Sequence, residues 1–171
     1  QNSALVTTSG TSTYSGGAAL TIGGLSGATG DLGSANVLNG YTGLVTALTL
    51  NPQTGVSVTY GGVISDGSGA MSLTKTGAGT QILTGANSYT GATIVNAGTL
   101  SVGVDGSLSS SSVLQINGGI FSYGNTSAGL TLNGLAVGGN STVSNTAASQ
   151  TLTLGAITRT ASIYGTVNFA T

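Results

Sequence analysis

Five charged side chains are available for chemistry in this chain of 171 residues. They are Asp31, Asp66, Asp105, Lys75 and Arg159, and the sequence has no His, Cys, Glu or Trp. Proton transfer, thiolate attack and histidine-built metal sites need residue types that are missing here. We therefore expect no catalytic, cofactor-binding or metal-binding residue, and no enzymatic activity.

Asp66 and Asp105 are the pair of side chains with a conceivable catalytic role, because two carboxylates can hydrolyse a glycosidic bond. Each of them is followed by Gly, and Asp-Gly is a turn-forming dipeptide. We favour the turn interpretation, with a polysaccharide-active enzyme as the alternative. We expect no calcium site at Asp31, since one carboxylate cannot supply the six or more oxygen ligands of calcium.

The scarcity of charge also limits the partners of this chain. Charged residues make up 3% of it and the formal net charge is -1, so it lacks the several Lys and Arg contacts that nucleic-acid binding requires. No run approaches the roughly 20 apolar residues of a spanning helix. We expect no nucleic-acid partner and no membrane span in this chain, and the first residue, Gln rather than Met, predicts a processed or excised polypeptide.

Short apolar segments alternate with Gly- and Asn-centred turns along the whole chain. Val, Ile, Leu and Thr interleave with a period of two, which is typical of strands, and Gly recurs too often for long helices. Ala-Gly-Thr occurs at 78–80 and again at 97–99, and Gly98 is followed by Gly119 at nearly the same spacing. A period near twenty residues predicts a β-solenoid of about eight coils, formed by one all-β domain over residues 1–171. Within it we expect separate strands at 130–132 and 135–137.

Residues 75–103 read KTGAGTQILTGANSYTGATIVNAGTLSVG. This segment resembles the autotransporter-associated β-strand repeat, also called the passenger-associated transport repeat, whose pattern is K-x-G-x-G-T-x-x-L-x-G-x-N-x-Y-x-G-x-T-x-[IV]-x-x-G-T-L. The framework positions that match include Lys75, Gly77, Gly79, Asn87, Tyr89, Gly91 and Gly98. The resemblance implies a right-handed parallel β-helix from the passenger of an exported bacterial protein, and hence a secreted, extracellular or outer-surface location.

The expected function is structural: a segment or subunit of a bacterial surface or extracellular fibre that stacks coil on coil and end to end. Its expected partners are further copies of itself or adjacent segments of a longer chain, because exposed terminal strands are templates for further pairing. The self-association residues that we predict lie near the two ends of the chain: Ala4, Leu5, Val6, Val167, Asn168 and Phe169.

Two further functions stay open. An adhesin would bind a glycan or a host cell surface, with Tyr14, Tyr41 or Tyr89 stacking on sugars; we expect instead that each ring packs at a coil edge with its hydroxyl at the solvent. An ice-binding protein would use the Thr-x-Thr pairs, of which 74–76 and 151–153 are examples. High strand propensity alone explains these threonines.

Overall fold

The computed structural model describes residues 5–6, 19–27, 46–66, 69–103, 108–147, 149–159 and 165–171. Every regular element in these ranges is a β-strand, and each strand pairs with its neighbours in parallel. Among these residues there is no helix with the length and apolar character needed to cross a membrane. The predicted all-β class is confirmed.

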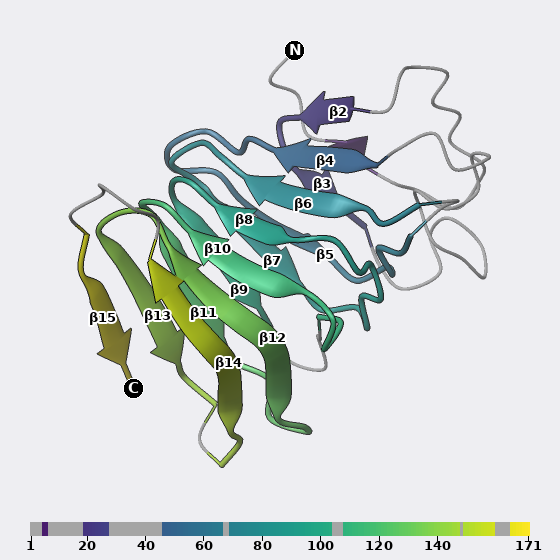
Figure 1. The fold of residues 1–171 in the computed structure, drawn as a ribbon. Coiled ribbons are helices and arrows are strands. Elements are labelled where there is room, and N and C mark those ends of the chain that lie inside the picture. The colour runs from purple at the N-terminus through teal and green to yellow at the C-terminus, as the bar shows by residue number, and fades with distance from the viewer. Residues whose placement is uncertain are drawn as a thin grey trace.

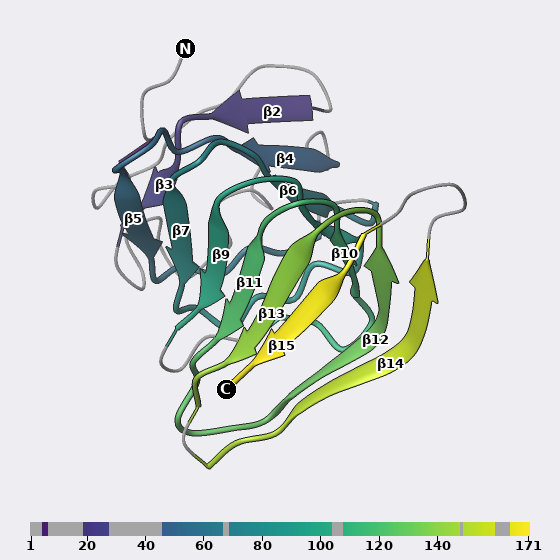
Figure 2. The ribbon, with the colours of Figure 1, turned by 90° about the vertical axis from the view of Figure 1, so that its left-hand side faces the viewer.

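The strands form two large sheets that wall the core (Figure 1, Figure 2). The even sheet contains β2 (Ala19–Ile22), β4 (Ala47–Leu50), β6 (Ser72–Lys75), β8 (Thr93–Val95), β10 (Val113–Ile116), β12 (Leu130–Val137) and β14 (Leu152–Arg159). The odd sheet contains β5 (Ser57–Tyr60), β7 (Thr80–Leu83), β9 (Thr99–Val102), β11 (Ile120–Tyr123), β13 (Ser141–Asn145) and β15 (Val167–Ala170). A short pair, β1 (Leu5–Val6) and β3 (Leu25–Ser26), lies beyond β5.

From β4 onward the chain visits the two sheets in turn, so each of these coils contributes one strand to each sheet. This arrangement is the parallel β-solenoid that the sequence predicts. One inward-facing ladder of the even sheet, which we call the cation ladder, follows the register through Ile22, Leu50, Lys75, Val95, Ile116, Val137 and Arg159.

The number of coils is smaller than the eight expected. The even sheet has seven strands and the odd sheet six in the described part of the chain. The cause is coil length. Lys75 pairs with Val95, a step close to the expected period, but Ile22 pairs with Leu50 and Val143 with Phe169, which are clearly longer steps. A period taken from the middle of the chain therefore gave too many coils.

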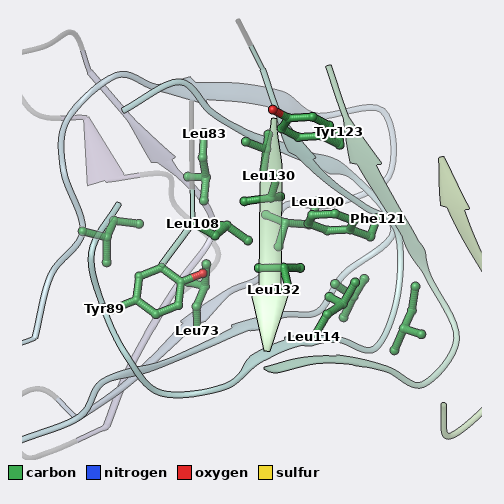
Figure 3. Packing of buried hydrophobic residues seen from close by; sticks show 14 of the residues in the cluster. Leu73, Leu83, Tyr89, Leu100, Leu108, Leu114, Phe121, Tyr123, Leu130 and Leu132 are labelled. Atoms are coloured by element: carbon green, nitrogen blue, oxygen red, sulfur yellow. The ribbon is translucent and has the colours of Figure 1, made fainter. Parts of the chain in front are cut away.

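Alternation of side chains builds the core. In β4, β6, β7, β9 and β10 every second residue is buried, and the side chains of Leu73, Tyr89, Leu114 and Phe121 gather in the same interior (Figure 3). Because each strand stacks on its equivalent in the next coil, each inward side chain of an interior coil is covered by the coil above and the coil below. The stability of such a stack comes from contacts between neighbouring coils.

The segments 130–132 and 135–137 are one continuous strand, β12, rather than the two strands that we expected. Gly155 of β14 faces the middle of β12, and a Cβ at Gly155 would lie 2.0 Å from the Asn133 carbonyl oxygen. Gly155 therefore allows the backbones of β12 and β14 to approach each other closely. The Asn-Gly pair at 133–134 looks like a turn in the sequence but stays extended.

Candidate functional site

Lys75 is completely buried on the inward side of β6. Its Nζ atom donates hydrogen bonds to the carbonyl oxygens of Thr76, Gly77 (2.8 Å) and Ala97 (3.1 Å). Thr76 and Gly77 belong to the turn that follows Lys75, whereas Ala97 belongs to the same turn of the next coil. The three donors of the ammonium group thus find three acceptors. Burial lowers the pKa of Lys75 to about 8, so its ammonium group is mostly charged at neutral pH. We call this set of hydrogen bonds between two coils the Lys75 clamp.

Two framework glycines leave the room that this clamp needs. Gly77 and Gly98 have φ angles of +64° and +61°, in the left-handed region that favours glycine. A Cβ at Gly98 would lie 2.4 Å from the carbonyl oxygens of Gly77 and Gly79 and 2.8 Å from Nζ of Lys75. The lysine and the glycines of the repeat pattern therefore form one structural unit.

Tyr89 is completely buried, and its hydroxyl lies 2.7 Å from Oγ1 of Thr93. Thr93 Oγ1 is in turn 2.9 Å from Oγ of Ser112, which donates to the carbonyl oxygen of Gly91. Burial raises the pKa of the Tyr89 phenol, although the Thr93 hydrogen bond acts in the opposite direction. Our expectation of a hydroxyl at the solvent was wrong for Tyr89, because the ring fills the interior (Figure 3). This ring cannot stack on a sugar, and Tyr14 and Tyr41 lie outside the described residues.

The other framework residues also join neighbouring coils. The side chain of Asn87 accepts a hydrogen bond from the Ile64 amide (2.9 Å) and donates one to the Gly85 carbonyl (2.8 Å). A Cβ at Gly79 would lie 2.3 Å from the carbonyl oxygen of Gln53, and a Cβ at Gly91 would lie 2.4 Å from that of Met71. Close backbone approach accounts for both glycines.

The carboxylate of Asp66 accepts hydrogen bonds from its own loop and from the next coil. Its Oδ1 accepts from the amides of Met71 (2.8 Å) and Thr90 (2.9 Å), and its Oδ2 accepts from the Thr90 hydroxyl (2.6 Å). Burial raises the pKa of Asp66, but the hydrogen bonds from Thr90 and Met71 outweigh this and bring it below its usual value. The proposed acid partner Asp105 lies outside the described residues, as does Asp31.

The predicted self-association residues near the C-terminus lie on β15, the last strand of the odd sheet. Val167 is half-buried, Asn168 is exposed, and the Phe169 side chain is 58% exposed. At the other end, Leu5 and Val6 form β1 and pair with β3. Ala4 lies outside the described residues. The prediction for these positions thus concerns the two terminal strands of the odd-sheet stack.

Arg159 is the residue that sequence reasoning missed. It stands in the cation ladder four coils after Lys75, yet its side chain is exposed and its Nη2 donates to the Gly165 carbonyl (3.2 Å). A signal existed in the sequence: LTKT at 73–76 and ITRT at 157–160 share the order apolar, Thr, cation, Thr. The chain between the two cations is divided into four ladder steps of similar length, so the two motifs are equivalent positions of the repeat.

A shallow groove of about 600 Å³ crosses the outer side of the turns that lead into the odd sheet. Its lining includes one outward ladder, formed by Thr99, Ile120, Thr142 and Asn168. No hydrogen bond of the Thr99 or Thr142 hydroxyl occurs within the described part of the chain, and Ile120 is 41% exposed. The groove thus offers uncharged hydroxyl and amide groups beside the apolar side chains of Ala78 and Ile120. The same described residues hold no cluster of three or more His, Cys, Asp or Glu suited to a metal ion.

Residues 73–102, which span β6 to β9, match the family model of the passenger-associated transport repeat. The chain carries this repeat. The Lys75 clamp, the buried Tyr89 and the Asn87 link all lie within the matched segment of the repeat.

A curated protein, the Adhesin BmaC autotransporter of Brucella suis biovar 1 (strain 1330), is 46% identical to this chain over 63 residues. The match covers 36% of this chain and 2% of that protein, so the chain spans only a small part of the relative that it matches. No solved structure matches the chain.

Proposed function

We propose that this chain is a structural segment of a passenger that a bacterium secretes and exposes at its outer surface. The observation that carries the proposal is that the passenger-associated transport repeat at 73–102 forms an integral part of a parallel solenoid. Its Lys75 and Asn87 side chains tie one coil to the next. The proposal assigns the segment no catalytic role and no cofactor.

In this role the segment supplies length and stiffness to a longer surface structure. Each coil satisfies the backbone groups of its neighbour and buries an apolar ladder against it. The terminal strands, β1 at one end and β15 at the other, continue the stack by end-to-end contact with adjacent segments or further copies. Leu5, Val6, Val167, Asn168 and Phe169 would make these contacts, together with Ala4.

The location is tested on intact cells of the bacterium that makes the protein. An antibody raised against residues 1–171 should label unpermeabilised cells, and protease added to the medium should remove the label while a cytoplasmic marker stays intact. Labelling that appears only after permeabilisation would contradict the proposal.

Adhesion is the second candidate function, and two observations favour it. The matched relative is named an adhesin, and the groove beside Thr99 and Thr142 presents hydroxyl groups without charge, which suits a neutral glycan. The double variant Thr99→Val and Thr142→Val should then lose at least about tenfold in affinity for a glycan found on an array, the loss expected for about 1.4 kcal/mol.

The matched control carries Thr49→Val and Thr74→Val, which change an outward ladder of the even sheet. Equal glycan affinity of both double variants would show that the groove is not the glycan-binding site. Absence of glycan and cell-surface binding by the wild-type chain would leave the structural role alone.

A further inference from the structure

We propose that Arg159 is a second clamp residue, equivalent to Lys75, and that the C-terminal end of the solenoid docks a further parallel coil from an adjacent segment of a longer polypeptide. The inference rests on the proposed structural role and names the partner of this end. We call the surface formed by Leu152, Leu154, Ile157, Arg159 and Phe169 the end face.

Apart from Arg159 the end face is apolar, and no coil of the described residues covers it. Ile157 is 61% exposed and Phe169 is 58% exposed, whereas the residues below them in the same ladders, Leu135 and Val143, are 0% and 2% exposed. A hollow of about 210 Å³ opens between the end strands, lined in part by Leu152 and Phe169. The outer edges of β14 and β15 have no partner strand in the described part of the chain. Free strand edges beside an apolar surface favour pairing with another strand.

The position of Arg159 indicates what this partner presents. Lys75 reaches across to the Ala97 carbonyl, which lies just after Val95, its neighbour in the cation ladder. A coil stacked on β14 would place the equivalent carbonyl beside the guanidinium of Arg159. Arginine offers five N–H donors, so it can keep its bond to Gly165 and still bind carbonyls of the added turn.

The order of the strands argues for an adjacent segment rather than a second copy. Strands alternate between the two sheets, and β15 belongs to the odd sheet, so a strand that follows it must join the even sheet on β14. The first strand of the described residues is β1, which pairs with β3 and so belongs to the stack of the odd sheet. A second copy would therefore present a strand of the odd-sheet stack where the even sheet needs the next strand. The match with the adhesin also covers only 2% of that protein, so a segment similar to this one lies within a much longer polypeptide.

The test adds a coil of known geometry to the full chain. Residues 84–103, the coil that covers Lys75, are fused after Thr171, with a shuffled version of the same segment as the control. The native extension should raise the thermal unfolding midpoint by at least about 5 °C and protect the β14 amides from hydrogen exchange, and the shuffled extension should do neither. No difference between the two extensions would overturn the docking proposal.

Arg159 is tested in two backgrounds, the chain that carries the native extension and the 171-residue chain. Arg159→Met should lower the midpoint of the extended chain by about 4 °C and that of the 171-residue chain by less than about 1 °C, whereas Arg159→Lys should retain the gain. Equal effects of Arg159→Met in both backgrounds would overturn the clamp. Sedimentation of the 171-residue chain as stable head-to-tail oligomers would overturn the choice of an adjacent segment and identify a second copy as the partner. None of these results depends on where the protein is located, so they fail or succeed separately from the cell-surface experiment.

Discussion

Lys75 and Arg159 occupy the same position of two coils and have opposite surroundings. The lysine is completely buried and the arginine is exposed, although both lie in the cation ladder. Between them the ladder holds Val95, Ile116 and Val137, all buried. The difference comes from the neighbours: a coil lies above and below Lys75, and only one side of Arg159 is covered by the described strands.

Apolar residues repeat this contrast. Leu135 and Ile157 are adjacent in one inward ladder, yet Leu135 is 0% exposed and Ile157 is 61% exposed. In a solenoid, then, a strand does not bury its own side chains; the next coil does. Interior and terminal coils with similar sequences should therefore differ in their sensitivity to substitution.

The largest effect is expected at a glycine of the interior clamp. Gly98→Ala forces a Cβ to within 2.4 Å of two carbonyl oxygens and also imposes a positive φ on alanine. We expect a loss of at least about 3 kcal/mol in the free energy of unfolding, measured by urea denaturation. The matched control is Gly55→Ala, which has a φ of +78° but no atom within 4 Å of the added Cβ, and which should cost about 1 kcal/mol. Similar losses in the two variants would mean that crowding at the clamp is relieved by movement.

The next effect compares the two cations directly. Lys75→Met leaves three partly buried carbonyl oxygens without their donor, and we expect a loss of about 2 kcal/mol by urea denaturation. Arg159→Met changes an exposed side chain and should alter the stability of the 171-residue chain by less than about 0.5 kcal/mol. If the two substitutions lower the free energy of unfolding equally, burial by the next coil does not determine how much the clamp stabilises the fold.

A smaller effect is expected for the buried hydroxyl chain. Tyr89→Phe removes the hydrogen bond to Thr93, which keeps its contact with Ser112, so we expect a loss of about 1 kcal/mol. Thr99→Val removes an outward hydroxyl that has no hydrogen bond in the described residues and should change the stability by less than about 0.5 kcal/mol. Thermal unfolding of both variants measures the two losses in stability. A larger loss for Thr99→Val would contradict the assignment of inward and outward ladders.

The smallest effect concerns acid. The pKa of Asp66 lies below 3.8 in the fold, so the unfolded chain binds more protons as the pH falls below that value. The stability that Asp66 contributes is therefore present above about pH 3.8 and is lost as the pH falls through its folded pKa. As the pH falls below about 3.8, protection from hydrogen exchange should be lost first at the amides of Met71 and Thr90, which donate to Asp66.

The C-terminal part of the chain provides the internal control for this acid effect, because residues 106–171 contain no Asp or Glu. Their exchange should follow only the intrinsic pH dependence, and Asp66→Asn should remove the extra exchange at Met71 and Thr90. Uniform loss of protection along the whole chain would show that Asp66 does not act locally.

The parallel solenoid could be predicted from the sequence because the turns carry a local signal. The Lys75, Gly77 and Gly98 positions follow a known pattern, and the structure explains it by one clamp. The orientation of Tyr89 could not be predicted, since an interior wide enough for a whole ring depends on how two sheets are spaced, which no local pattern encodes.

The equivalence of Arg159 and Lys75 was missed although LTKT and ITRT share the same order of residue types. The four ladder steps between the two cations are similar in length, but a four-residue likeness fixes no register until the strand pairing is known. Coils elsewhere are longer, since the step from Ile22 to Leu50 exceeds the step from Lys75 to Val95, so one period does not hold along the whole chain. The count of coils failed for the same reason.

The parallel stacking also has a mechanical consequence. Tension applied along the axis at the last strand loads the hydrogen bonds of one coil before those of the next, so the rod should unravel in steps. Each step would release one coil, which corresponds to about 70 Å of extended chain. Under load, such a segment would lengthen coil by coil and absorb work at every step while the coils further from the pull keep their structure.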